Sequence, residues 1–196
     1  MKYILISLGV IILIIFGVVI FNRGPSTVRT PEKKKITLID YSDNSNATVS
    51  FTVDGPINAI EDHRSIKISI SLTLRQVTVF TGYEGQVLSS QSYANDINSY
   101  GDFLAALTRA GFVKERHIDS DVSPRSICAT GSRSFYKIVD NGEDVMDLWT
   151  ASCTKGSYGG SVPQTNSLFR AQIPNYNQAV SGTSISTGGG STGLVL

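Results

Sequence analysis

Two cysteines are the residues of this chain whose chemistry is most limited by their spacing. Cys128 and Cys153 are its only cysteines, and they lie too far apart for a C-x-x-C redox pair. One lies just before the first strand of an expected β-hairpin and the other just after its second strand, so they can come level across the hairpin. We therefore predict a disulfide bond between them. Two inert thiols are the alternative. A nucleophilic Cys128 with His117 as its base is a further one, without a supporting local motif.

The sequence lacks the residue patterns that metal and cofactor sites require. A zinc site at the cysteines would need two more ligands, and the only histidines, His63 and His117, lie in polar stretches. Residues 188–193 match G-x-G-x-x-G, but no expected strand precedes them and no helix follows. Residues 119–121 lack the spaced ligands of an EF-hand loop. We therefore expect no metal, no cofactor and no catalytic residues, with an envelope hydrolase using His63 or His117 left as an alternative.

One aromatic stretch is the candidate for ligand binding. Trp149, the only tryptophan, precedes Cys153 by four positions, and Tyr158 follows in a segment rich in glycine, Asn and Gln. Aromatic faces beside amide side chains are typical of carbohydrate and peptide sites. We take Trp149 and Tyr158 as candidate ligand-binding residues; the alternative is that Trp149 packs on the disulfide as core.

The N-terminus carries a candidate membrane anchor. The segment from Tyr3 to Phe21 has no charged residue and is apolar on every side of a helix. As a helix it would cover roughly 28 Å, close to the hydrocarbon thickness of a bilayer. It is longer than the apolar core of a cleaved signal, and no small-x-small cleavage motif follows it. We predict one retained transmembrane helix within residues 1–23, in contact with membrane lipid.

Two features of the sequence disagree on which side of the membrane the chain after the anchor lies. Several cations come directly after the anchor: Arg23, Arg29, Lys33, Lys34 and Lys35. By the positive-inside rule they would place the following chain in the cytoplasm. A disulfide requires an oxidising compartment, and the following chain is rich in Ser, Thr, Asn and Gly. We predict a single-pass protein of the cell membrane whose domain is extracytoplasmic.

Composition divides the remainder into a linker, one domain and a tail. Residues 24–35 predict a juxtamembrane linker, residues 36–178 one domain, and residues 179–196 a disordered tail rich in Gly, Ser and Thr. The 17 Lys and Arg nearly balance the 16 Asp and Glu, a net charge of +1, so we expect no nucleic-acid partner.

The domain reads mainly as β-structure with one clear helix. Alternating apolar residues predict strands, Asn141-Gly142 predicts a hairpin turn, and an i, i+3, i+4 pattern predicts a helix capped by Asn98 or Ser99 and ended by Gly111. Strands are expected from Ile36, over 48–53, over 66–80 with a bulge or bend at 75–76, and over 86–93, 134–139 and 145–152, and a short helix over 166–172. This order predicts an α+β fold with an antiparallel sheet and one main packed helix.

The whole pattern resembles that of small, singly anchored envelope proteins of bacteria. From it we expect a membrane-anchored extracytoplasmic interaction or structural domain, with an envelope protein or glycan as its partner. The alternative is an accessory subunit of a secretion or pilus-like surface assembly.

Overall fold

The computed structural model describes residues 36–118, 123–183 and 185. The predicted anchor, the linker and most of the predicted tail lie outside the described residues. Within the described part, no helix is long and apolar enough to cross a membrane.

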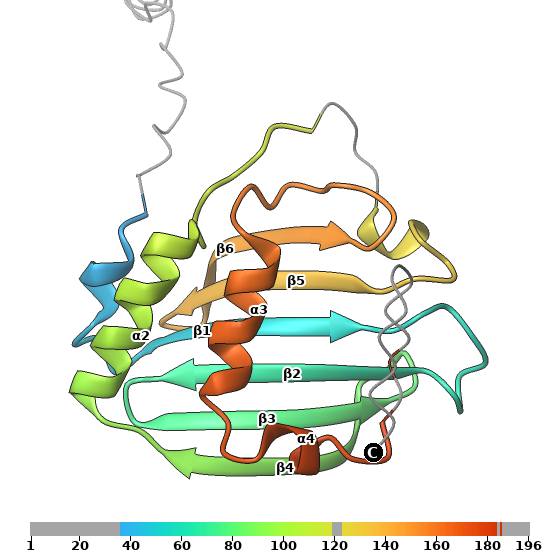
Figure 1. Ribbon diagram of the computed structural model, residues 1–196, viewed down its shortest axis with the longest axis horizontal. Coiled ribbons are helices and arrows are strands. Elements are labelled where there is room, and N and C mark those ends of the chain that lie inside the picture. The colour runs from blue at the N-terminus through green and yellow to red at the C-terminus, as the bar shows by residue number, and fades with distance from the viewer. Residues whose placement is uncertain (1–35, 119–122, 184, 186–196) are drawn as a thin grey trace, which may run out of the picture. The chain divides into compact units, whose positions relative to one another are not determined.

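Six strands of the described chain form one antiparallel sheet (Figure 1). They are β1 (Ala47–Asp54), β2 (Arg64–Ser71), β3 (Leu74–Thr81), β4 (Gln86–Ala94), β5 (Arg133–Asp140) and β6 (Glu143–Ala151). Their order across the sheet is β4-β3-β2-β1-β5-β6, so β1 pairs with both β2 and β5. The helix α2 (Ile97–Ala110) packs on this sheet, which confirms the α+β prediction.

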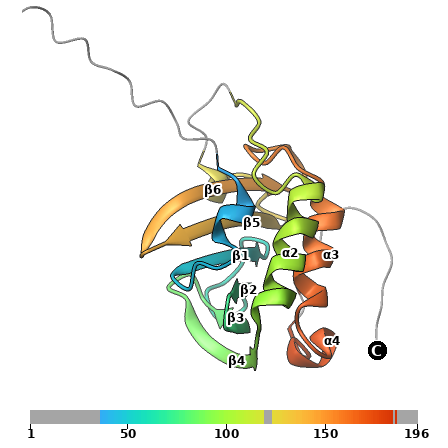
Figure 2. The same ribbon diagram turned by 90° about the vertical axis from the view of Figure 1, so that its left-hand side faces the viewer.

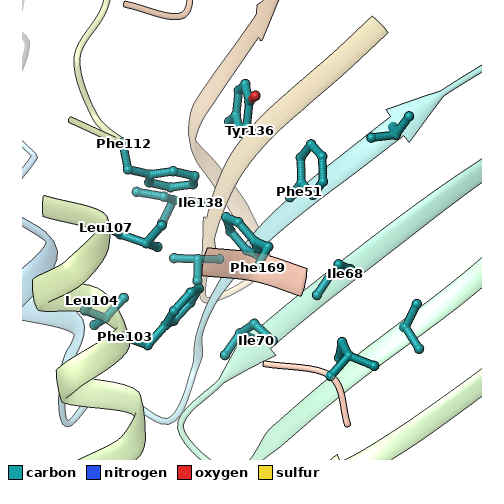
Figure 3. Packing of buried hydrophobic residues seen from close by; sticks show 14 of the residues in the cluster. Phe51, Ile68, Ile70, Phe103, Leu104, Leu107, Phe112, Tyr136, Ile138 and Phe169 are labelled. Carbon is teal, nitrogen blue, oxygen red and sulfur yellow. The ribbon is translucent and has the colours of Figure 1, made fainter. Parts of the chain in front are cut away.

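The core lies between one face of the sheet and the helices. Side chains of a strand alternate between its two faces, so every second residue of β1, β2 and β5 points toward α2 and α3 (Val162–Ala171). Phe169 of α3 meets Phe51 and Phe103 at ring-centroid distances of 5.7 and 5.2 Å. Figure 3 shows these rings interleaved with aliphatic side chains from both layers.

The predicted strand over 66–80 is wrong, because the structure divides it into the hairpin of β2 and β3. Both strands place apolar side chains in the same core. Apolar residues therefore recur on both sides of the turn at Leu72 and Thr73, and the sequence resembles one long strand. The turn lacks the Gly or Pro that marks most turns, and Asn95 stabilises it by donating to the Ser71 carbonyl at 2.7 Å. Reversal of the chain, rather than a bulge at 75–76, causes the shift in phase.

Asp96 caps α2, in place of the predicted Asn98 or Ser99. Its carboxylate accepts from the backbone N–H groups of both residues at 3.0 Å. The predicted C-terminus is confirmed: Gly111 has a φ of 75°, and the Phe112 N–H donates to the Leu107 carbonyl at 3.0 Å.

The ends of the domain differ from prediction. The segment from Ile36 forms no strand; it leads into the 3-10 helix η1 (Leu38–Tyr41), whose Leu38 is buried in the core beside α2. Helix α3 begins four residues before the predicted 166, because Pro163 suits the first turn of a helix. The short helices η2 (Pro124–Ser126) and α4 (Tyr176–Ala179) complete the described elements.

The second hairpin is confirmed as predicted. Asn141 and Gly142 join β5 to β6 with φ values of 52° and 83°, the positive pair that a tight hairpin turn requires.

Candidate functional site

No α-helix of the described residues lies on the second face of the sheet. Figure 2 shows α2, α3 and α4 together on one side of the sheet. The residues that point to the other side form what we call the open face, and most of them are polar or charged. By strand register they include Ser50, Thr52, Asp54, Ser65, Lys67, Ser69, Gln76, Thr78, Phe80, Arg133, Phe135, Lys137, Asp147 and Trp149, which lies opposite Phe135.

A cleft of about 730 Å³ lies over the open face. Its base is formed by β1, β2 and β5, and one end is formed by the chain around His63 and by the turn that holds Tyr83. Arg125, from the segment just before β5, also lines it. These residues lie far apart in sequence, and the antiparallel register brings them together.

A buried ionic cluster of Asp54, His63 and Arg133 forms the floor of the cleft. Asp54 Oδ1 lies 2.8 Å from His63 Nε2, and Asp54 Oδ2 lies 3.1 Å from Arg133 Nε and 3.0 Å from Arg133 Nη2. The side chains of His63 and Arg133 are 3% and 1% exposed. One carboxylate therefore balances two buried side chains, of which Arg133 is always charged.

Two further contacts fix the orientation of His63. Its Nδ1 lies 3.0 Å from the Pro56 carbonyl oxygen. Its ring stacks on Tyr83 at a centroid distance of 4.0 Å. The Tyr83 hydroxyl donates to the Asn58 carbonyl at 2.8 Å and accepts from the Asn58 N–H at 2.9 Å. Ring stacking and hydrogen bonds thus hold His63, Tyr83 and Asn58 together at this end of the cleft.

Arg133 keeps one donor group without an acceptor. Its Nη2 also donates to the Gly55 carbonyl, but Nη1 is buried and has no hydrogen-bond partner among the described residues. A buried polar atom of this kind calls for an explanation, because leaving it unsatisfied costs about 1–3 kcal/mol.

The lysines of the open face differ in their pairing. Lys137 contacts Asp144 at 2.8 Å and Asp147 at 3.2 Å. The hydrogen bond to Asp144 is the main reason that the pKa of Lys137 lies above its ordinary value. Lys67, in the middle of the face, makes no ion pair within the described part of the chain.

The predicted disulfide is confirmed and lies next to the cleft. Cys128 and Cys153 are bonded, with their Cα atoms 5.8 Å apart. The residue after Cys128, Ala129, accepts from the Ile57 N–H at 2.7 Å, and Ile57 lines the cleft. The bond therefore fastens the segment before β5 to the end of β6 and to one wall of the cleft.

The two predicted ligand-binding aromatics lie outside the cleft lining. Trp149 is 9% exposed, and its ring lies so close to Gly156 that a Cβ there would come within 2.5 Å of it. Tyr158 is 1% exposed, stacks on Tyr136 at 3.9 Å, and shares a 2.6 Å hydrogen bond with Thr165. Burial raises the pKa of Tyr158. Ligand binding by either ring stays a prediction.

His63 and His117, the histidines of the enzyme alternative, have separate surroundings. His63 belongs to the floor of the cleft, whereas His117 is exposed and is not among the residues that line it. No group of three or more His, Cys, Asp or Glu side chains within the described ranges could hold a metal ion.

Sequence reasoning missed the open face. The signal was present in β1, where Ser50, Thr52 and Asp54 alternate with buried apolar residues, and in the lysines inside β2 and β5.

A scan against protein-family models finds no matching family, and a search of curated proteins finds no match.

Proposed function

We propose that this protein is a membrane-anchored, extracytoplasmic interaction domain that binds its partner through the open face of the sheet. The observation that carries the proposal is the cleft, which hollows a sheet face that no described helix covers. Concave sites with a few convergent polar groups are where proteins commonly hold ligands.

The composition of the cleft floor supports binding over a purely structural role. Charges buried in a protein cost desolvation energy, and well-packed apolar residues are often at least as stabilising. Asp54, His63 and Arg133 nevertheless occupy this floor, surrounded by hydroxyl and lysine side chains. A face built only for stability would not need them.

The location of the domain is supported by two independent features. The bond between Cys128 and Cys153 suits an oxidising compartment. The uncharged segment from Tyr3 to Phe21 suits a retained membrane span.

Protease and thiol accessibility in intact cells test this placement. We expect added protease to degrade the domain, and a maleimide reagent to label the two cysteines only after reduction. Full protection from protease, together with free thiols at both cysteines, would contradict the proposal.

A second candidate, a subunit of a surface assembly, is favoured by the edge strand β4. No residue of β4 is charged, and Val87 and Leu88 are 62% and 55% exposed. The other edge, β6, carries Asp144 and Asp147, and its end bonds to the following loop. Uncovered, uncharged edge strands are where another chain adds by backbone hydrogen bonds.

The substitution Leu88→Lys tests this candidate. If β4 joins subunits, the full chain purified in detergent sediments as an assembly, and Leu88→Lys shifts it to the single-chain species. Ile60→Lys is the matched control, because Ile60 is 56% exposed but lies outside the strands. Recovery of the unaltered protein alone, as a single chain, argues against an assembly subunit.

A further inference from the structure

Lys67 lies at the centre of the open face among hydroxyl side chains. Register places Thr52 beside it on β1 and Thr78 beside it on β3, while Ser65 and Ser69 flank it on the same face of β2. The nearest carboxylate of the cleft floor, Asp54, is already engaged by His63 and Arg133. Lys67 is therefore a cation available to a ligand, with hydroxyl donors around it.

The cleft as a whole has an excess of positive charge. Four cations and two carboxylates line it, which gives a net charge of +2 before His63 is counted. The cations are Lys67, Arg125, Arg133 and Lys137, and the carboxylates are Asp54 and Asp147. Asp144, which pairs with Lys137 from outside the lining, lowers this excess to +1, and a phosphate ester, at about −1.5 to −2 at neutral pH, is an anion that the remaining positive charge attracts.

Arg133 adds a second, independent indication of an anion. Three buried side-chain atoms of the described chain lack a hydrogen-bond partner, and Arg133 Nη1 is the one whose residue lines the cleft. Nη1 itself has no accessible surface, so an anion oxygen at the floor would supply the missing acceptor once the Arg133 side chain shifts toward the cleft. Charge-assisted hydrogen bonds from Arg to phosphate are among the stronger polar contacts in proteins.

Aromatic side chains stand on both sides of this polar strip. Phe80 lies on β3 and Phe135 on β5, with β2 and β1 between them. Three strand spacings place the two strands roughly 14 Å apart across the sheet, and Phe135 lies two residues along β5 from Arg133, the residue level with Phe80. The cleft of about 730 Å³ is far larger than a phosphate ion, so it leaves room for an apolar group against either ring.

We propose that the cleft binds a phosphate ester, with the phosphate group at Lys67 and Arg133 and an apolar substituent against Phe80 or Phe135. This inference rests on the proposed function, because it names the ligand class of the same open face. The shared chemistry is the phosphate group, which a free ion or an ester can supply, and the apolar walls favour the ester.

Calorimetric titration of the full chain in detergent, at constant ionic strength, tests the proposal. The probes are phenyl phosphate, inorganic phosphate and benzoate. We expect phenyl phosphate to bind on the order of tenfold more tightly than either of the others, since it alone has both the charge and the ring. Lack of binding by phenyl phosphate, or equal binding of benzoate, would overturn the assignment.

Lys67→Gln locates the site. We expect it to weaken phenyl phosphate binding on the order of tenfold. Lys155→Gln, at an exposed lysine outside the cleft lining, should leave binding unchanged. Lys67→Arg keeps the charge and should retain most of the affinity, so it tests the site even if Lys67→Gln folds poorly. Unchanged affinity in Lys67→Gln rejects the site.

The result is separable from the test of the proposed function. Phenyl phosphate binding at Lys67 in a protein whose thiols are free and protected inside the cell would keep the site and reject the extracytoplasmic domain. An accessible, disulfide-bonded domain without such binding would reject the ligand class alone.

Discussion

At the scale of single residues, Asp54 is the residue on which the cleft floor depends most. Its carboxylate contacts both His63 and Arg133, and no other ion pair to these two occurs among the described residues. Removing one partner of a buried ionic group leaves the others uncompensated, which costs far more than losing an exposed pair.

We expect Asp54→Ala to lower the free energy of unfolding by about 3–5 kcal/mol, measured by chemical denaturation. Asp144→Ala is the control: it breaks the Lys137 contact, but Asp144 is 56% exposed, so the loss should stay below about 1 kcal/mol. Equal losses in the two variants would show that the cluster is not the ionic centre described above.

The buried hydroxyl pair of Tyr158 and Thr165 allows a second test. Thr165→Val leaves the Tyr158 hydroxyl without its 2.6 Å partner and should cost about 1–3 kcal/mol of unfolding free energy. Adding Tyr158→Phe removes the stranded hydroxyl, so the double variant should be less destabilised than the sum of the two single variants. A purely additive double variant contradicts a coupled pair.

At the scale of elements, the sequence indicated helix ends and turns better than it indicated strand limits. Gly111 and Asn141-Gly142 were recognisable because few residue types adopt a positive φ readily. The hairpin of β2 and β3 was not, because its turn residues, Leu72 and Thr73, are ordinary strand residues and both strands share one core.

The cap at Asp96 predicts a pH dependence. The hydrogen bond from the Ser99 backbone N–H is the largest cause that holds the Asp96 pKa below its ordinary value of 3.8. Because the folded state lowers this pKa, the cap stabilises the helix above pH 3.8 and the stabilisation is lost as the pH falls further.

Asp96→Ala should therefore lower the thermal midpoint at neutral pH, and the difference from the unaltered protein should shrink below pH 3.8. Asp102→Ala, at an exposed carboxylate elsewhere on α2, is the control. A difference that stays constant through this range contradicts capping by the carboxylate.

The disulfide joins the segment before β5 to the end of β6. We therefore expect its loss to lower the free energy of unfolding. Replacing Cys128 and Cys153 by Ser should lower the free energy of unfolding by about 3 kcal/mol, measured by denaturation under non-reducing conditions. The unaltered protein in reductant should show a similar loss, and no loss in either case contradicts a stabilising bond.

At the scale of the whole molecule, the fold class followed from residue patterns, whereas the site did not. Alternation and one amphipathic helix were enough for an α+β domain with an antiparallel sheet. The cleft depends on β5 returning to pair with β1, which puts Arg133 beside Asp54 although 79 positions separate them. Local pattern carries no information about that pairing, so polar residues within strands could not be assembled into one site.

The partner is expected to bind at the open face and not at the helical side. Asp147 and Asp102 are exposed carboxylates on the open face and on α2, respectively. Photo-crosslinking in intact cells, with p-benzoylphenylalanine at one or the other position of the full chain, compares the two faces directly. We expect a discrete adduct from position 147 and none from position 102. Adducts from position 102 alone would contradict this expectation.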